Sequence, residues 1–169
     1  IKASCGNEHS LILSKEHIVY SFGNNEDGLL GVNYIKENNN KSYKFIKVNF
    51  GENTNKIIDI SSGTAHNLAL TYEGKVYSWG SNQGQQLGLS QEILNQDKNY
   101  KNNFYIFNPK KISINSSIVK ISCGEAHSLV LTDHGKVYAW GFGSNGQFGL
   151  GFCEDTFEPG QGLAKSMRS

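Results

Sequence analysis

One stretch of sequence occurs three times along the chain, and this repetition constrains the fold more than any other feature. Residues 5–31, 62–88 and 123–149 align without a gap, at offsets of 57 and 61 residues. The copies read CGNEHSLILSKEHIVYSFGNNEDGLLG, SGTAHNLALTYEGKVYSWGSNQGQQLG and CGEAHSLVLTDHGKVYAWGFGSNGQFG. A fixed period of this length indicates an array of similar structural units.

Each copy has the pattern of short antiparallel strands. Residues 128–132 alternate polar and apolar side chains, and 136–140 is a β-branched and aromatic run. Gly135 between them favours a tight turn. A further strand is expected at 119–122, and Pro109 marks the run 105–112 as an edge strand or a strand start. About four short strands per repeat is typical of a propeller blade.

The third copy also contains GFGSNG, residues 141–146, which has the spacing of a dinucleotide-binding loop. Residues 147–152 then bring two further glycines and two aromatic residues, which form a poor first helical turn. The position of Gly143 is Asn25 and Asn82 in the other copies. We therefore interpret the string as a variant of the repeat and expect no nucleotide or other cofactor.

The repeat places the same residue types at the same points of each unit. We expect a structural role for these columns, in which histidines fix strands by hydrogen bonds and tryptophans pack between sheets. An alternative role for the tryptophans is as an exposed aromatic pair on a binding surface. The expected structural positions are Gly6, His9, Gly23, Gly31, Gly63, His66, Trp79, Gly80, Gly88, Gly124, His127, Trp140, Gly141 and Gly149.

Catalytic and metal-binding uses of these residues are less favoured. Histidines that recur once per unit do not converge on one zinc ion. His127 and Ser128 are adjacent in a strand, so their side chains point to opposite faces and cannot act as base and nucleophile. Three cysteines without C-x-x-C spacing indicate neither a metal site nor a redox pair. We expect no metal and no catalytic residue, and predict that the protein is not an enzyme.

The repeat resembles that of the RCC1 family, named for the regulator of chromosome condensation, with the rough signature C/S-G-x-x-H-S-L-x-L-T-x-x-G-x-V-Y-x-W-G-x-N-x-x-G-Q-L-G. The third copy, from Cys123 to Gly149, meets nearly every position. The resemblance implies a seven-bladed β-propeller, of which three copies form a part. We expect an all-β, RCC1-like propeller fragment of about three four-stranded antiparallel blades over residues 1–159. Long loops are expected at 32–56 and 90–117, and an irregular tail at 160–169.

The resemblance also implies a kind of function. The family includes exchange factors for the Ran-type small GTPase, chromatin binders, and propellers that dock protein partners. We expect a non-catalytic protein-interaction scaffold that binds a protein partner through propeller loops. The alternative is a guanine-nucleotide exchange factor for a Ran-type GTPase with chromatin association. Further expected partners are the remaining blades or other subunits of a complex, in an intracellular setting, either nuclear or cytoplasmic and cytoskeletal.

The connections between copies vary most, and one carries a candidate partner-binding patch. Lysines alternate with aromatic residues along 98–111, a combination that resembles nucleic-acid contact chemistry. A net charge of +1 gives no general support for nucleic-acid or membrane binding, and no membrane insertion is expected. The candidate residues are Lys98, Tyr100, Lys101 and Tyr105, in a run that also holds Phe104, Lys110 and Lys111.

Overall fold

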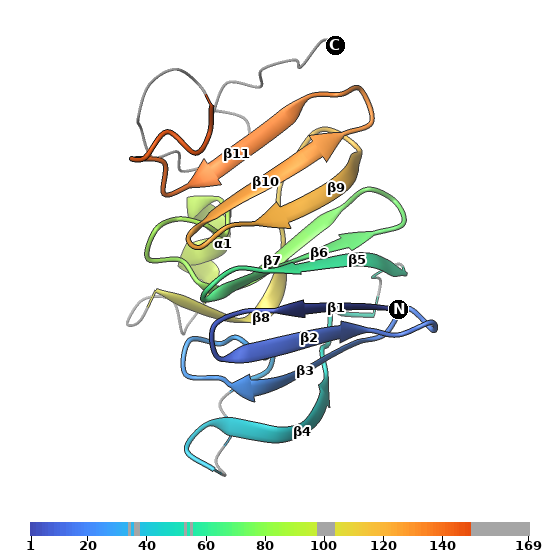
Figure 1. Ribbon diagram of the computed structural model, residues 1–169, viewed down its shortest axis with the longest axis vertical. Helices are drawn as coiled ribbons and strands as arrows, with labels where there is room; N and C mark the ends of the chain where they lie inside the picture. The colour runs from blue at the N-terminus through green and yellow to red at the C-terminus, as the bar shows by residue number, and fades with distance from the viewer. Residues whose placement is uncertain (34, 36–37, 53, 55, 98–103, 150–169) are drawn as a thin grey trace.

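A computed structural model gives the fold, and it describes residues 1–149 except 34, 36, 37, 53, 55 and 98–103. The described part forms three antiparallel sheets, stacked one on the next, and one short helix (Figure 1). The elements are β1 (Lys2–Cys5), β2 (His9–Leu13), β3 (Val19–Asn24), β4 (Lys41–Lys47), β5 (Ile57–Ser62), β6 (His66–Thr71), β7 (Val76–Ser81), α1 (Gln91–Gln96), β8 (Tyr105–Lys111), β9 (Ile118–Cys123), β10 (His127–Thr132) and β11 (Val137–Gly141).

Each copy of the repeat builds one sheet, which we call a blade. The strand order is β1-β2-β3-β4 in the first blade, β5-β6-β7-β8 in the second and β11-β10-β9 in the third. The predicted all-β propeller fold is confirmed, with three rather than four strands in the described part of the third blade. The short helix α1 lies in the 90–117 connection, where no helix was predicted, and its Leu94 is buried.

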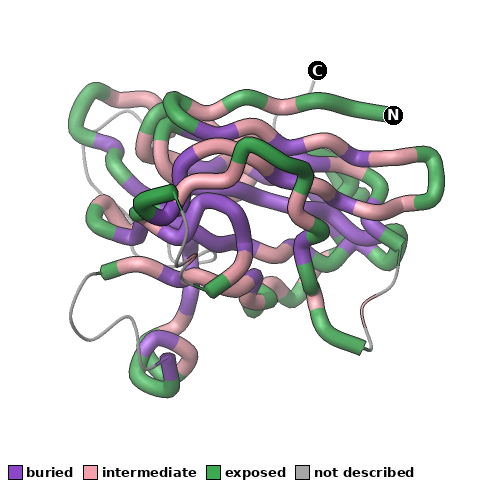
Figure 2. The backbone as a smooth tube through the Cα atoms, turned by 90° about the horizontal axis from the view of Figure 1, so that it is seen from below, coloured by how far each residue is buried: buried purple, intermediate pink, exposed green. Residues whose placement is uncertain are grey.

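Alternation with a period of two decides which side chains enter the core. In β2, His9, Leu11 and Leu13 are buried, while the two residues between them are half-buried. In β6 every residue is buried. This difference arises because the second blade lies between the other two and is covered on both faces. Figure 2 shows exposed backbone mainly in the turns at the periphery of the molecule.

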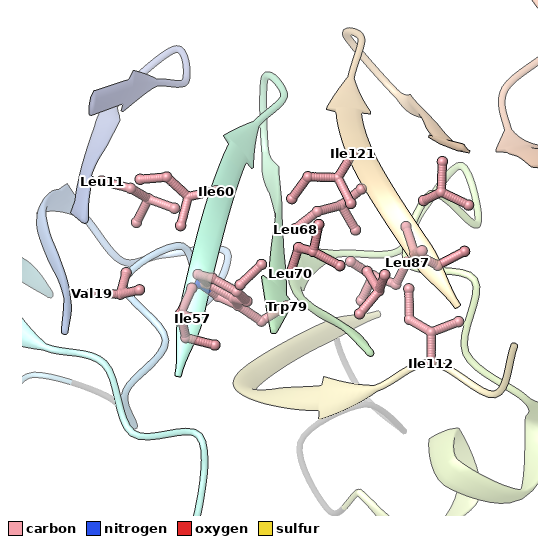
Figure 3. Close-up of a cluster of buried hydrophobic side chains, with 14 of the residues drawn as sticks. Leu11, Val19, Ile57, Ile60, Leu68, Leu70, Trp79, Leu87, Ile112 and Ile121 are labelled. Atoms are coloured by element: carbon pink, nitrogen blue, oxygen red, sulfur yellow. The ribbon is translucent and has the colours of Figure 1, made fainter. Parts of the chain in front are cut away.

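The hydrophobic core consists of the layers between neighbouring blades. Leu11 and Ile60 belong to the layer between the first and second blades, and Leu68, Leu87 and Ile121 to the layer between the second and third (Figure 3). All these side chains are at most 8% exposed. Burial of this extent makes apolar contact between blades the main stabilising term of the stack.

The blades have two different ends, at the left and right of Figure 1. The loop end carries the turns 6–8, 63–65 and 124–126 and the connections that follow β3, β7 and β11. The hairpin end carries the turns 14–18, 72–75 and 133–136. Opposite ends of β2, β6 and β10 join these two groups of turns, so each group forms a separate surface.

The outer edges of the first two blades are strands β4 and β8. The 32–56 connection, expected as a loop, contains β4, and Tyr43 and Phe45 of this strand are 80% and 66% exposed. The edge strand expected around Pro109 is β8, which pairs with β7 alone. Proline on such an edge removes a donor that a further strand would need.

Candidate protein-interaction site

The repeated histidines lie at the joints between blades. In the first joint, between the first and second blades, His9 Nε2 is 2.7 Å from Asn67 Oδ1. In the second joint, between the second and third blades, His66 Nε2 is 3.0 Å from Ser128 Oγ. Each of these histidines therefore contacts the residue that directly follows the histidine of the next copy, and its ring is engaged within the stack.

The tryptophans reach the same joints. Trp79 Nε1 donates a hydrogen bond of 3.1 Å to the carbonyl of Leu29, and Trp140 Nε1 one of 2.9 Å to the carbonyl of Gln86. Both indoles are fully buried. The acceptor in each case belongs to the turn that closes the preceding blade, so these side chains do not form an exposed aromatic surface.

Burial also sets the charge of the histidines. It lowers the pKa of His66 to about 3, and the neighbouring His127 and His9 act in the same direction. Burial lowers the pKa of His9 as well, against the hydrogen bond that its Nε2 donates to Asn67 Oδ1. Both rings are therefore neutral near pH 7. Among the described residues, no group of three or more His, Cys, Asp or Glu side chains could hold a metal ion.

The glycine columns follow from close approach at the joints. A Cβ on Gly63 would lie 2.5 Å from His66 Nδ1 and would also overlap the carbonyl oxygen of Gly124. The remaining columns have left-handed backbones, which glycine adopts without strain. They comprise Gly23, Gly80 and Gly141 at φ of 113°, 104° and 103°, and Gly31, Gly88 and Gly149 at 69°, 61° and 64°.

The GFGSNG string forms the same closing turn as the other copies. The N–H of Gly146 donates to the carbonyl of Gly143 over 3.0 Å, and that of Gly149 donates to the carbonyl of Gly146 over 3.0 Å. In the first copy Gly28 makes the matching bond to Asn25. These N–H groups are used within the turn, whereas a phosphate loop presents them to its ligand.

Tyr105 is the one candidate partner-binding residue that lies in the described part of the chain. It begins β8 at the loop end, and its hydroxyl accepts a hydrogen bond of 3.2 Å from Gln83 Nε2. A second hydrogen bond joins this hydroxyl to the carboxyl of Asp27 in the first blade. Lys98, Tyr100 and Lys101 lie outside the described residues.

Acidic residues of the first blade surround this tyrosine contact. We call Glu8, Glu26 and Asp27 the acidic seam, because together they line a hollow of about 200 Å³ where the first blade meets the second. Burial raises the pKa of Asp27, and the neighbouring charges of Glu26 and Glu8 add to the rise, against the hydrogen bond from Tyr105. Among the described residues, the lining of the hollow contains no lysine or arginine.

The sequence predicted a patch of lysines and aromatic residues along 98–111, most of whose candidate residues lie outside the described part of the chain, whereas the described side chains beside Tyr105 are acidic. Lys110 lies 3.3 Å from the carboxylate of Asp97, which is 7% exposed, so this lysine is already paired. Sequence reasoning missed the acidic seam, although a signal was available. Glu26 and Asp27 interrupt the repeat only in the first copy, where the others have Gln83-Gly84 and residues 144–145.

Comparison with known proteins identifies the family. A sequence model of the Regulator of chromosome condensation (RCC1) repeat matches residues 16–70, 73–131 and 134–164, and a second RCC1-repeat model matches 1–29, 57–86 and 118–147. The chain therefore belongs to the RCC1 repeat family.

Relatives with different named activities share this repeat. The chain is 36% identical over 159 residues to the probable E3 ubiquitin-protein ligase HERC4 of Rattus norvegicus, covering 94% of the chain and 14% of HERC4. It is 30% identical to the RCC1-like G exchanging factor-like protein of Mus musculus, covering 93% of the chain and 35% of that protein. Such relatives support a protein-interaction role for the repeat segment.

A solved structure shows the same arrangement of blades. Prp20p from Saccharomyces cerevisiae, a protein described with its binding to Gsp1p and histones, superposes with a TM-score of 0.81 at 27% identity. The match covers 94% of this chain and 37% of Prp20p. The chain thus spans less than half the length of these relatives.

One expectation from the sequence is corrected by these relatives. We predicted that the protein is not an enzyme, and this prediction is wrong at the level of the family, because HERC4 is named as a ubiquitin ligase. The prediction rested on the absence of a catalytic pattern within the repeats, which is a property of the repeats alone. Among the described residues, no helix is long and apolar enough to cross a membrane.

Proposed function

We propose that this segment binds a protein partner through its loop end, and that the partner presents a basic surface. The acidic seam carries the proposal. Three carboxylates and a partly buried hollow, whose described lining has no basic residue, attract and orient a basic group, because charge complementarity speeds encounter and fixes register. Asp27 is held in place by Tyr105, so the seam is preorganised.

The test compares two matched charge changes. Glu26→Gln removes a charge from the seam, and Glu73→Gln removes an exposed charge from the hairpin end. Binding of the protein to a purified Ran-type GTPase, and separately to core histones, is measured by biolayer interferometry. We expect Glu26→Gln to weaken binding to one of these probes roughly three- to tenfold and Glu73→Gln to change it less than about twofold. Equal effects of the two variants would contradict the proposal.

A second candidate function is guanine-nucleotide exchange on a Ran-type GTPase, with chromatin association. It is favoured by the likeness to Prp20p and to the mouse exchanging factor-like protein. The decisive measurement is release of a fluorescent GDP analogue from the GTPase, with and without the protein. Acceleration by the protein supports exchange activity, and binding without acceleration supports docking alone.

In a larger protein of the HERC4 kind, we propose that this segment contributes partner binding to the assembly. We also propose further blades as partners, in an intracellular setting. The proposal for further blades draws support from the outer side of the first blade, where Phe45 packs against Phe22 and Tyr20 at ring distances of 5.2 and 6.3 Å. Phe22 occupies the column of Trp79 and Trp140, both of which are covered by a preceding blade.

A further inference from the structure

The hairpin end holds a second hollow, and a histidine in place of a glycine forms part of its wall. His17 occupies the column of Gly74 and Gly135. Its backbone is left-handed, with φ of 63° against 73° and 77° for the two glycines. A side chain in this conformation is strained, so the surrounding structure must hold it there. The contacts of the His17 side chain are therefore part of what holds this backbone conformation.

The imidazole of His17 reaches across the first joint. Its Nδ1 lies 2.9 Å from the carbonyl oxygen of Ile57 at the start of β5. Because a carbonyl oxygen only accepts hydrogen bonds, Nδ1 carries the proton and Nε2 of the neutral ring carries the lone pair. The structure records no hydrogen bond from Nε2 to any described residue. The ring is therefore fixed in orientation with one acceptor available.

The second joint has no room for such a side chain. There the N–H of Ile118 donates directly to the carbonyl of Gly74 over 3.1 Å. A Cβ on Gly74 would lie 2.8 Å from Ile118 N and would overlap Ser117 Oγ. The connection is also shorter, with five residues between Ile112 and Ile118 against eight between Val48 and Ile57. The first joint alone is therefore held open at its hairpin end.

The opening in the first joint is a hollow of about 320 Å³ with anchored walls. Thr54 Oγ1 lies 3.1 Å from the hydroxyl of Tyr77, and the ring of Phe50 packs edge-on against Trp79 at 5.6 Å. Both contacts fasten the connection to the second blade. The polar and aromatic residues of the lining include Glu16, His17, Lys47, Phe50, Thr54 and Lys56.

We propose that this hollow binds an acidic peptide segment of a protein partner, at a site separate from the loop end. Lys47 and Lys56 are exposed and outnumber the single acid of the lining, Glu16. They pair with a carboxylate of the segment, while His17 Nε2 accepts a hydrogen bond from its backbone N–H and Phe50 covers an apolar neighbour. Nucleic acid is disfavoured, because binding a row of phosphates needs more cations than two.

The proposal is tested with a fluorescein-labelled peptide of eight residues that alternates glutamate and leucine, titrated with the intact protein and followed by fluorescence anisotropy. The variants are Lys47→Gln, Lys56→Gln and His17→Gly, the last of which installs the residue that the other copies carry. The matched control is Lys75→Gln, which removes an exposed lysine from the same end of the second blade, outside the hollow.

We expect each of the two lysine variants in the hollow to weaken binding roughly three- to fivefold, and His17→Gly about threefold, with Lys75→Gln within about twofold of the unchanged protein. Four outcomes would overturn the proposal. These are absence of peptide binding, equal weakening by Lys75→Gln, equal affinity for a peptide with glutamine in place of glutamate, and tighter binding of an oligothymidylate that depends on the same lysines.

Discussion

The two joints between blades share one hydrogen-bond arrangement but form it with different side chains. In the first joint the carbonyl of Leu29 accepts hydrogen bonds from Asn67 Nδ2 at 3.0 Å and Trp79 Nε1 at 3.1 Å. In the second the carbonyl of Gln86 accepts them from Ser128 Oγ at 2.8 Å and Trp140 Nε1 at 2.9 Å. The acceptor is backbone in both cases, so asparagine and serine are interchangeable as donors.

At the hairpin end, by contrast, the two joints are spanned by different kinds of contact. The first joint is spanned there by a side chain, His17, and the second by a backbone contact between Gly74 and Ile118. Only the first joint has the longer connection that carries Phe50 and Thr54. The two joints therefore have matching contacts where residues of the repeat columns meet. At the hairpin end their contacts differ, because the connection that reaches each joint there differs in length.

The largest expected effect is loss of a joint tryptophan. Trp140→Ala should lower the free energy of unfolding by about 3–5 kcal/mol, because it removes a fully buried indole and leaves the carbonyl of Gln86 with one donor fewer. Trp79→Ala should cost at least as much, since Phe50 also loses its ring contact. Chemical denaturation measures both. Nearly unchanged denaturation curves would mean that the tryptophan contacts shared by the two joints do not stabilise the fold.

The glycine that faces His66 in the second joint should be less tolerant of substitution than the glycine that faces His127 in the third blade. Gly63→Ala is expected to cost about 2–4 kcal/mol, because the new methyl group meets both the His66 ring and the backbone oxygen of Gly124. At Gly124 the nearest atoms belong to the His127 ring alone, which is only partly buried and can move. Gly124→Ala should therefore cost about half as much in the same denaturation assay. Equal costs would show that the ring contact dominates in both places.

Acid should weaken the second joint through His66. The unfolded imidazole takes up a proton below pH 6.5, whereas the buried one does so only near pH 3. The free energy of unfolding therefore falls as the pH drops from 6.5 toward 3, by roughly 1.4 kcal/mol per pH unit for this group. Above pH 6.5 the contribution is constant.

Denaturation at several pH values checks this slope. His66→Gln should reduce it, leaving the shares of His9 and His127, whose pKa values burial also lowers. His134→Gln is the matched control, because this side chain is 84% exposed. An unchanged slope in His66→Gln would contradict the assigned role of burial.

A reciprocal exchange probes the hairpin end. His17→Gly relieves a left-handed backbone and loses one hydrogen bond to Ile57, so its stability should change by less than about 1 kcal/mol. Gly74→His should cost about 2–3 kcal/mol, because Ser117 and Ile118 occupy the space that the side chain needs. Thermal melting compares the two variants. If Gly74→His is tolerated as well as His17→Gly, the second joint can open like the first.

The smallest effect is expected in the closing turn of the third copy. Asn25 and Asn82 accept the N–H of Leu30 at 3.0 Å and of Leu87 at 3.1 Å through their side chains, and Gly143 stands in their column. Gly143→Asn should raise stability by about 0.5–1 kcal/mol, because it restores an acceptor and removes freedom from the unfolded chain. A decrease in melting temperature would mean that the third turn has diverged from the others.

The fold could be predicted because its signals are local and were read three times. Period-two alternation recurs in all three copies, and a turn glycine follows the second strand of the second and third copies, so chance agreement is removed. The proline of β8 marks a further strand. Strand β4 was missed, since its sequence, KSYKFIK, lies in an asparagine- and lysine-rich connection. The helix α1 was missed because six residues are too few to show a helical period.

What the sequence by itself determined is the unit, namely its strands, its turns and the columns that recur in every blade. Which atoms meet across a joint was decided by the tertiary structure, because residues about 60 positions apart become neighbours only when blades stack. The acidic seam and the open hairpin end of the first joint arise in this way. Asp27 contacts Tyr105, and His17 contacts Ile57, because of the way neighbouring sheets pack on each other, which no local sequence pattern specifies.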